Sequence, residues 1–92
     1  MFNHVLKGAA MLQTIVRLPT VKKETGYSRS TIYLRIAQGL WPKQVRLGVR
    51  SVGWPVGEIA TMNAARIAGK TDDEIKLLVR KIEIARKQGA TK

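Results

Sequence analysis

The chain has 92 residues, no cysteine and one histidine, and its 17 lysines and arginines against 6 acids give a net charge of +11. A chain of this length forms one domain, and without cysteine it can hold neither a disulfide framework nor a thiolate metal site. With one histidine, no Gly-rich phosphate loop and no pair of acids outside a helix cap, no catalytic or metal-binding set can be assembled, so we expect no enzyme, no cofactor and no metal.

The positive charge is densest in the first half of the chain. Residues 17–50 carry eight lysines and arginines and a single acid, Glu24, whereas residues 66–92 carry eight cations and four acids. A small basic body needs an anionic partner, and nucleic acid is the first candidate. An anionic membrane surface or an acidic protein would satisfy the same charge, so its distribution matters more than its total.

The first residues show no clear hydrophobic period. We expect a mobile arm over residues 1–13, then a short strand over residues 14–18, where β-branched side chains gather. Pro19 sets the first-turn geometry of a brief helix over residues 20–25, with Val21 facing inward. This helix is too short to be stable alone and must pack against the next one.

The stretch from Thr25 to Gly39 carries the main functional signal. Gly26 can end the first helix, Ser28 can cap the second through its hydroxyl, and Gly39 can stop it. At about 100° per residue the second helix has two faces. The apolar face holds Ile32, Tyr33, Ile36, Ala37 and Leu40, and the polar face holds Ser30, Thr31, Leu34, Arg35 and Gln38. Two helices joined by a glycine turn typify a helix-turn-helix, whose second helix enters the major groove; the alternative is a solvated polar face.

A β-hairpin is predicted directly after this pair of helices. Trp41 precedes a proline and is expected in the core, and residues 44–54 alternate apolar and polar around a turn at Gly48–Ser51. In a helix-turn-helix protein such a hairpin is a wing. Arg50 lies at its tip and Arg46 on its outer face, where they could reach phosphates or a narrow minor groove. The alternative is a structural hairpin with solvated arginines.

Two further helices complete the chain. The first is bracketed by Pro55 and Gly69, and its apolar residues are expected to back the recognition helix; they are Ile59, Met62, Ala65, Ile67 and Ala68. Thr71 and Glu74 form a capping box for a last helix that runs to about Lys87. Its apolar stripe comprises Ile75, Leu78, Val79, Ile82 and Ala85, with Leu77 and Ile84 off the stripe. This helix either folds back on the domain or pairs with a second copy; its acidic cap and lack of aromatic residues disfavour a membrane surface.

Several motifs in one order resemble a known family. They are RLP-x-V at 17–21, TG-x-SRSTIY at 25–33, G-x-x-PK at 39–43, VRLG-x-R at 45–50 and VGW at 52–54. They are similar to the AlpA-like phage and prophage regulators, small winged-helix proteins related to excisionases and to the DNA-binding domain of MerR-type regulators. The resemblance covers residues 15–69. It implies sequence-specific binding of bacterial double-stranded DNA, in transcription of prophage or genomic-island genes, in excision as a recombination directionality factor, or in both.

The resemblance also implies where DNA is contacted, with residues 28–38 in the major groove and Arg50 on the wing. The side chains expected to read bases are Arg29, Ser30, Thr31, Leu34 and Arg35. The side chains expected to meet the DNA backbone are Arg17, Lys22, Lys23, Ser28, Tyr33, Gln38, Lys43 and Arg46. Family members often have an arginine directly after the tyrosine, where this chain has Leu34, so base readout is expected to shift by about 100° around the helix. A tryptophan common eight residues after the position of Trp54 is Met62 here, which alters packing.

The sequence therefore predicts a mainly α winged helix-turn-helix protein with a small β-hairpin wing and an additional C-terminal helix. Its expected parts are an arm (1–13), the DNA-binding domain (14–69) and the C-terminal amphipathic helix (70–92). We expect it in the cytoplasm at the nucleoid, with duplex DNA, a second copy of itself and an integrase as partners. The alternatives are a non-specific basic nucleic-acid-binding protein and a small adaptor that works through its C-terminal helix.

Overall fold

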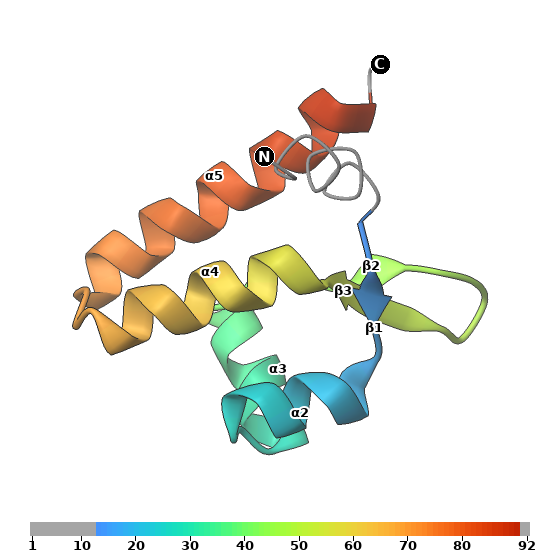
Figure 1. Cartoon of the computed structure of the whole chain (residues 1–92), viewed down its shortest axis with the longest axis horizontal. Helices are drawn as coiled ribbons and strands as arrows, with labels where there is room; N and C mark the ends of the chain where they lie inside the picture. Colours follow the sequence, from blue (N-terminus) through green and yellow to red (C-terminus); the bar gives the residue numbers. More distant parts are fainter. Residues whose placement is uncertain (1–12, 91–92) are drawn as a thin grey trace, which may run out of the picture.

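Figure 1 shows the computed structural model of the chain, which describes residues 13–90. Three short strands and four helices follow one another within these residues: β1 (Ile15–Val16), α2 (Leu18–Thr25), α3 (Arg29–Ala37), β2 (Val45–Arg46), β3 (Val52–Pro55), α4 (Val56–Ile67) and α5 (Asp72–Ala90). This architecture confirms the predicted winged helix-turn-helix with an added C-terminal helix. The arm expected over residues 1–13 lies outside the described residues except for Gln13.

The turn between α2 and α3 forms as its residue types predict. Gly26 ends α2 with a left-handed φ of 77°, and its N–H donates to the carbonyl of Lys22. Ser28 caps α3, because its Oγ accepts from the N–H of Thr31 at 3.1 Å. Helix α2 begins two residues earlier than predicted, at Leu18, because Pro19 is favoured in a first turn rather than in a strand. The strand expected to reach Leu18 therefore stops at Val16.

The wing belongs to a three-stranded antiparallel sheet of order β1-β3-β2. Ile15 pairs with Pro55 on one side of β3, and Val45 pairs with Gly53 on the other. Gly53 is required in this central strand, since a Cβ there would lie 2.7 Å from Ile15 Cγ2 and from the Val16 carbonyl oxygen. The sheet ties the start of the chain to the wing, a pairing that the hairpin pattern alone did not predict.

The core lies where α2, α3, α4 and α5 meet β3. Its buried apolar residues are Val21, Ile32, Leu40, Trp41, Trp54, Ile59, Met62, Ala65, Ile75 and Val79. Trp54 lies at its centre with no exposed surface, and its indole Nε1 donates to the Pro42 carbonyl at 2.9 Å. Ile75 and Val79 bring α5 into this core, so within this structure α5 folds back on the domain. Trp41 is 2% exposed, which confirms its expected place in the core.

Some apolar residues do not face the core as expected. Ala37, Ala68 and Ala85 are exposed, and Ile67 is 88% exposed. Ala37 is the last residue of α3, and Ile67 is the last residue of α4, where the chain turns at Gly69 and no further element of the described chain covers them. The predicted inward positions of these four residues were therefore wrong, because a helical wheel does not show where the neighbouring helix ends.

The capping box at the start of α5 forms as predicted. Glu74 Oε1 accepts from the N–H of Thr71 at 2.8 Å, and Thr71 Oγ1 accepts from the N–H of Glu74 at 3.2 Å. The hydrogen bond from the Thr71 N–H holds the pKa of the Glu74 carboxyl below its ordinary value, with smaller contributions from the Thr71 hydroxyl and Lys70. Helix α5 continues three residues past the predicted end. None of the described helices combines the length and hydrophobicity that a membrane span requires.

Candidate nucleic-acid interface

The outward face of α3 differs at two residues from the predicted polar face. Arg29, Ser30, Leu34 and Gln38 are exposed, and Leu34 keeps 57% of its surface in solvent. Thr31 and Arg35, which are predicted on the same face, are instead half-buried. The structure thus presents a ridge of small, polar and aliphatic side chains with Leu34 at its middle.

Two arginines of α3 are held against aromatic rings. The Arg35 guanidinium carbon lies 4.8 Å from the centroid of the Tyr27 ring, and that of Arg29 lies 5.5 Å from the Tyr33 ring. Tyr27 is itself braced edge-on against Trp41, with centroids 6.0 Å apart. Stacking of this kind restricts a guanidinium without neutralising it, because a ring carries no net charge.

The surroundings of Arg35 are unusual for a half-buried cation. Its Nε is buried and finds no hydrogen-bond partner in the described part of the chain. Neither Arg35 nor Arg29 forms an ion pair with a described carboxylate. Both arginines therefore keep a charge that no described carboxylate neutralises.

The start of α3 presents two linked hydroxyls. The Ser28 hydroxyl donates to Thr31 Oγ1 at 3.0 Å while it accepts from the Thr31 N–H. Thr31 Oγ1 therefore acts as an acceptor toward Ser28 and keeps its own hydrogen for another acceptor. These two side chains have a defined geometry at the edge of the outward face.

The basic residues of α2 flank this face. Lys22 and Lys23 lie in the last turn of α2, and Arg17 precedes its first residue. All three are exposed, and none has an ion pair within residues 13–90. The C-terminal end of α2 is held by α4, because Asn63 Nδ2 donates to the Glu24 carbonyl at 3.0 Å.

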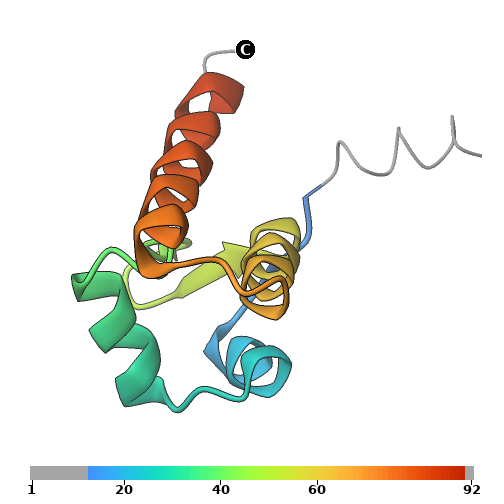
Figure 2. The same cartoon turned by 90° about the vertical axis from the view of Figure 1, so that its left-hand side faces the viewer.

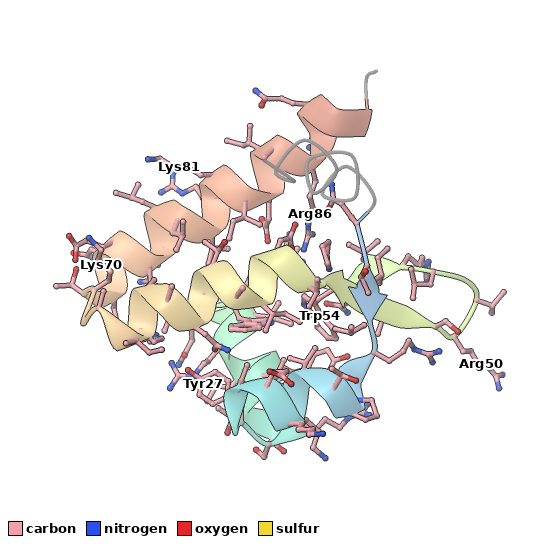
Figure 3. The ribbon with its side chains drawn as sticks, viewed as in Figure 1. Tyr27, Arg50, Trp54, Lys70, Lys81 and Arg86 are labelled. Carbon is pink, nitrogen blue, oxygen red and sulfur yellow. The ribbon has the colours of Figure 1, made fainter. Side chains whose placement is uncertain are left out.

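The wing projects from the body at the end of the sheet, and Figure 3 shows Arg50 pointing away from the helices. Its turn is closed by the N–H of Leu47, which donates to the Ser51 carbonyl at 2.7 Å. Val49 is 91% exposed beside Arg50, and Arg46 is exposed on β2. The structure therefore confirms the hairpin, with a tip that combines one apolar side chain and one cation.

The segment between α3 and the wing is held by α5, a contact that sequence reasoning missed. The N–H of Lys43 donates to Glu83 Oε2 at 2.9 Å, and the carbonyl of Lys43 accepts from Arg86 Nη2 at 2.8 Å. Arg86 also donates to both carboxylate oxygens of Glu58 on α4, at 2.9 and 2.6 Å. Forty residues separate Lys43 from Glu83, so no local pattern could have indicated the pairing. These bonds define the Lys43 clamp, formed by Lys43, Glu58, Glu83 and Arg86.

A family model matches most of this domain. Residues 14–67 match the model described as the prophage CP4-57 regulatory protein (AlpA). The chain belongs to the AlpA family. The match runs from β1 to the last residue of α4 and leaves α5 outside it.

Two curated proteins are similar to this AlpA-family chain. One is the uncharacterized protein ORF88 of Enterobacteria phage P4, which is 43% identical over 58 residues, covering 63% of this chain and 66% of the phage protein. The other is the DNA-binding transcriptional activator AlpA of Escherichia coli K12, which is 43% identical over 51 residues, covering 49% of this chain and 73% of that protein. The chain thus spans slightly less than two thirds of the phage P4 protein. No solved structure matches it.

Proposed function

We propose that this chain is a sequence-specific regulator that binds duplex DNA of a prophage or genomic island and controls transcription, excision, or both. The main supporting observation is that Arg29 and Arg35 of α3 lie on aromatic rings without a neutralising acid. Exposed cations at α2 and on the wing add to this positive charge. Membership of the AlpA family supports this proposal, as does the similarity to AlpA of Escherichia coli, a DNA-binding transcriptional activator.

In this proposal α3 enters the major groove and reads base edges. Serine, threonine and arginine are side chains that donate to or accept from base edges, and an exposed leucine can contact a thymine methyl group. The proposed readers are Arg29, Ser30, Thr31, Leu34 and Arg35. The stacking of Arg35 on Tyr27 favours this role, because a guanidinium with a restricted plane loses less freedom when it binds bidentately.

The remaining cations would position the protein on the phosphate backbone. Contacts to phosphates give affinity and register and do not discriminate between sequences directly. The proposed backbone residues are Arg17, Lys22, Lys23, Ser28, Tyr33, Gln38, Lys43 and Arg46, with Arg50 on the wing. The exposure of the three α2 residues and of the wing arginines supports this assignment.

The direct test is fluorescence-anisotropy binding to DNA tiles that cover the protein's own promoter and the nearest attachment site, with a scrambled tile as control. A salt series accompanies each tile. Preferential binding to one tile would support the regulator, and its location would separate a promoter target from an excision target. Equal affinity for every tile would contradict the proposal and leave the non-specific basic protein.

Two substitutions separate base reading from backbone contact. Arg35→Ala is expected to lose about 1–3 kcal/mol of binding free energy at one base position, whereas Lys23→Ala should weaken every sequence about equally. The two variants are compared on the preferred tile and on single-base variants of it. An Arg35→Ala variant whose base preferences are unchanged would remove Arg35 from the reading set.

Excision and self-association are separate parts of the proposal. If the chain acts in excision, binding to the attachment-site tile should be strengthened by the integrase of the same element. If copies associate on DNA, the binding curve on a long tile should be steeper than on a tile that holds one site. A curve of equal steepness on both would argue for independent monomers.

A further inference from the structure

Two adjoining hollows run along one flank of α5. The smaller, of about 190 Å³, lies between α5 and the C-terminal end of α3 and is lined in part by Ile36, Gly39 and Lys76. The larger, of about 470 Å³, continues toward the end of α5 and is lined in part by Gln44 and Lys87. Both are lined by Lys43, Arg80 and Glu83, so the two hollows adjoin one another, and together they are called the α5 groove.

The α5 side of this groove is a regular basic stripe. Residues 76, 80, 83 and 87 are spaced by four, three and four positions, which places them on one flank of a helix. Three of them are cations, Lys76, Arg80 and Lys87, and all three are exposed. The stripe runs over twelve residues, from 76 to 87, or about 16 Å along the helix axis.

The one acid of the stripe is already used inside the fold. Glu83 accepts from the backbone N–H of Lys43, and this bond holds Lys43 on the opposite wall of the groove. Arg86 is paired with Glu58, which leaves the other cations of the groove without an ion pair among residues 13–90. The α5 groove thus has four cations without an ion pair in the described part of the chain: Lys43, Lys76, Arg80 and Lys87.

The groove begins where α3 ends. Lys76 lies so close to the end of α3 that a Cβ on Gly39 would be 3.8 Å from its Cγ. Figure 2 shows α3 and α5 one above the other along the same side of the molecule, with α4 on the other side. A DNA duplex that is bound at α3 and extends toward α5 would therefore run alongside the groove.

We propose that the α5 groove binds backbone phosphates of the duplex beside the segment contacted by α3. This inference rests on the proposed function, and it assigns to α5, which lies outside the family match, a part in DNA binding. Phosphates suit a channel lined by long cationic side chains, because each neutralised phosphate releases a condensed counterion. The stripe's length corresponds to the rise of about five base pairs of duplex.

The test compares two pairs of substitutions that remove the same charge. Arg80→Gln with Lys87→Gln removes two of the four groove cations, and Lys70→Gln with Lys81→Gln is the matched control, since Lys70 and Lys81 line a different hollow of α5 with Leu77. Figure 3 shows both control lysines on the outer side of the chain. Urea unfolding of both full-length variants establishes that they are folded. Binding is measured by anisotropy on the preferred duplex, with flanks of full length and with the flanks trimmed by five base pairs on each side.

The groove variant is expected to reduce the slope of log K against log salt by about 1.8, at about 0.9 per lost phosphate contact. When the salt concentration rises fourfold, the factor by which the affinity falls should therefore be about ten times smaller for the groove variant than for the wild-type protein. The control should keep the wild-type slope on the long duplex, and on the trimmed duplex the groove variant should bind like the wild-type protein.

Two outcomes would overturn the inference. Equal slope changes in both variants would mean that the groove contributes only general charge. An unchanged slope in the groove variant would mean that no phosphate is bound there, and a surface for an acidic protein would take its place. A wild-type protein without any preferred tile would contradict the proposed function instead, while the slope comparison on any long duplex would still test the groove.

Discussion

The Lys43 clamp gives the sharpest prediction about stability. Arg86→Met keeps most of the side-chain stem and removes the guanidinium that donates to both Glu58 oxygens and to the Lys43 carbonyl. After the substitution the Glu58 carboxylate, whose side chain is 14% exposed, has lost its only ion-pair partner in the described part of the chain. The Lys43 carbonyl loses its donor from α5 as well.

The expected cost follows from burial. Removing one partner of a fully buried ion pair costs about 3–5 kcal/mol, whereas an exposed pair contributes about 0–1 kcal/mol. Arg86 is 23% exposed and water can reach part of Glu58, so we expect a loss of about 2–3 kcal/mol in the free energy of unfolding. A small domain has about 5–15 kcal/mol in total, which makes this loss large.

Urea unfolding followed by circular dichroism measures the loss, and the midpoint should fall by about 1–2 M. The second arm of the experiment is a double-mutant cycle with Glu58→Met. Because the double variant leaves no unpaired charge, it should cost at least about 1 kcal/mol less than the sum of the two single variants. Arg66→Met is the control, since the Arg66–Asp72 pair is longer, at 3.5 Å, and more exposed, and should cost less than about 1 kcal/mol.

Two results would refute this reasoning. A loss below about 0.5 kcal/mol for Arg86→Met would mean that the pair behaves like an exposed one. Strict additivity in the cycle would mean that Arg86 and Glu58 do not stabilise one another, whatever each contributes separately.

Three further predictions concern the helices and the sheet. Ile32→Ala removes a side chain with no exposed surface and should cost about 2–4 kcal/mol by urea unfolding; a loss below about 1 kcal/mol would contradict its core role. Gly26→Ala places a Cβ in open space at a φ of 77° and should lower the free energy of unfolding by about 1–2 kcal/mol. In Gly53→Ala the new Cβ would lie 2.7 Å from the Val16 carbonyl oxygen, so this variant should have the lower melting temperature of the two. Equal melting temperatures would contradict the steric argument. Folding lowers the pKa of Glu74, so its contribution to stability is present at neutral pH and is lost as the pH falls through the pKa of the folded state. The difference in unfolding free energy between wild type and Glu74→Gln should therefore shrink from pH 7 to pH 3. A difference that grows over this range would contradict the direction of the pKa shift.

The local elements could be predicted because their causes lie within a few residues of one another. Gly26 and Ser28 shape the turn, and Thr71 and Glu74 form the cap of α5, each through contacts that span at most four positions. Such interactions depend on residue type and spacing alone, which a sequence displays directly. The helix-turn-helix and the wing could therefore be predicted from the residue types and their spacing.

The contacts that shape the candidate site could be predicted only in part. Arg29 and Tyr33 are four positions apart on one helix, so their stacking was available from spacing. Tyr27 lies in the turn just before α3 and Arg35 lies two helical turns further on, so their contact depends on how the turn residue folds back along the helix. The Lys43 clamp joins residues some forty positions apart and depends on where α5 docks. Tertiary packing supplied this information, and no periodic pattern carries it.

The distribution of acids explains why the charge of this chain is directed outward. Four of the six acids make contacts inside the fold: Glu58 with Arg86, Asp72 with Arg66, Glu74 with Thr71 and Glu83 with the N–H of Lys43. Only two cations are neutralised in this way among the described residues, so the field of the others adds up over α2, α3, the wing and the α5 groove. The net charge alone does not distinguish this chain from any other basic protein, whereas the placement of its charges does. Two of these acids, Glu74 and Glu83, accept from backbone N–H groups, so they position the start of α5 and the Lys43 segment without neutralising a cation.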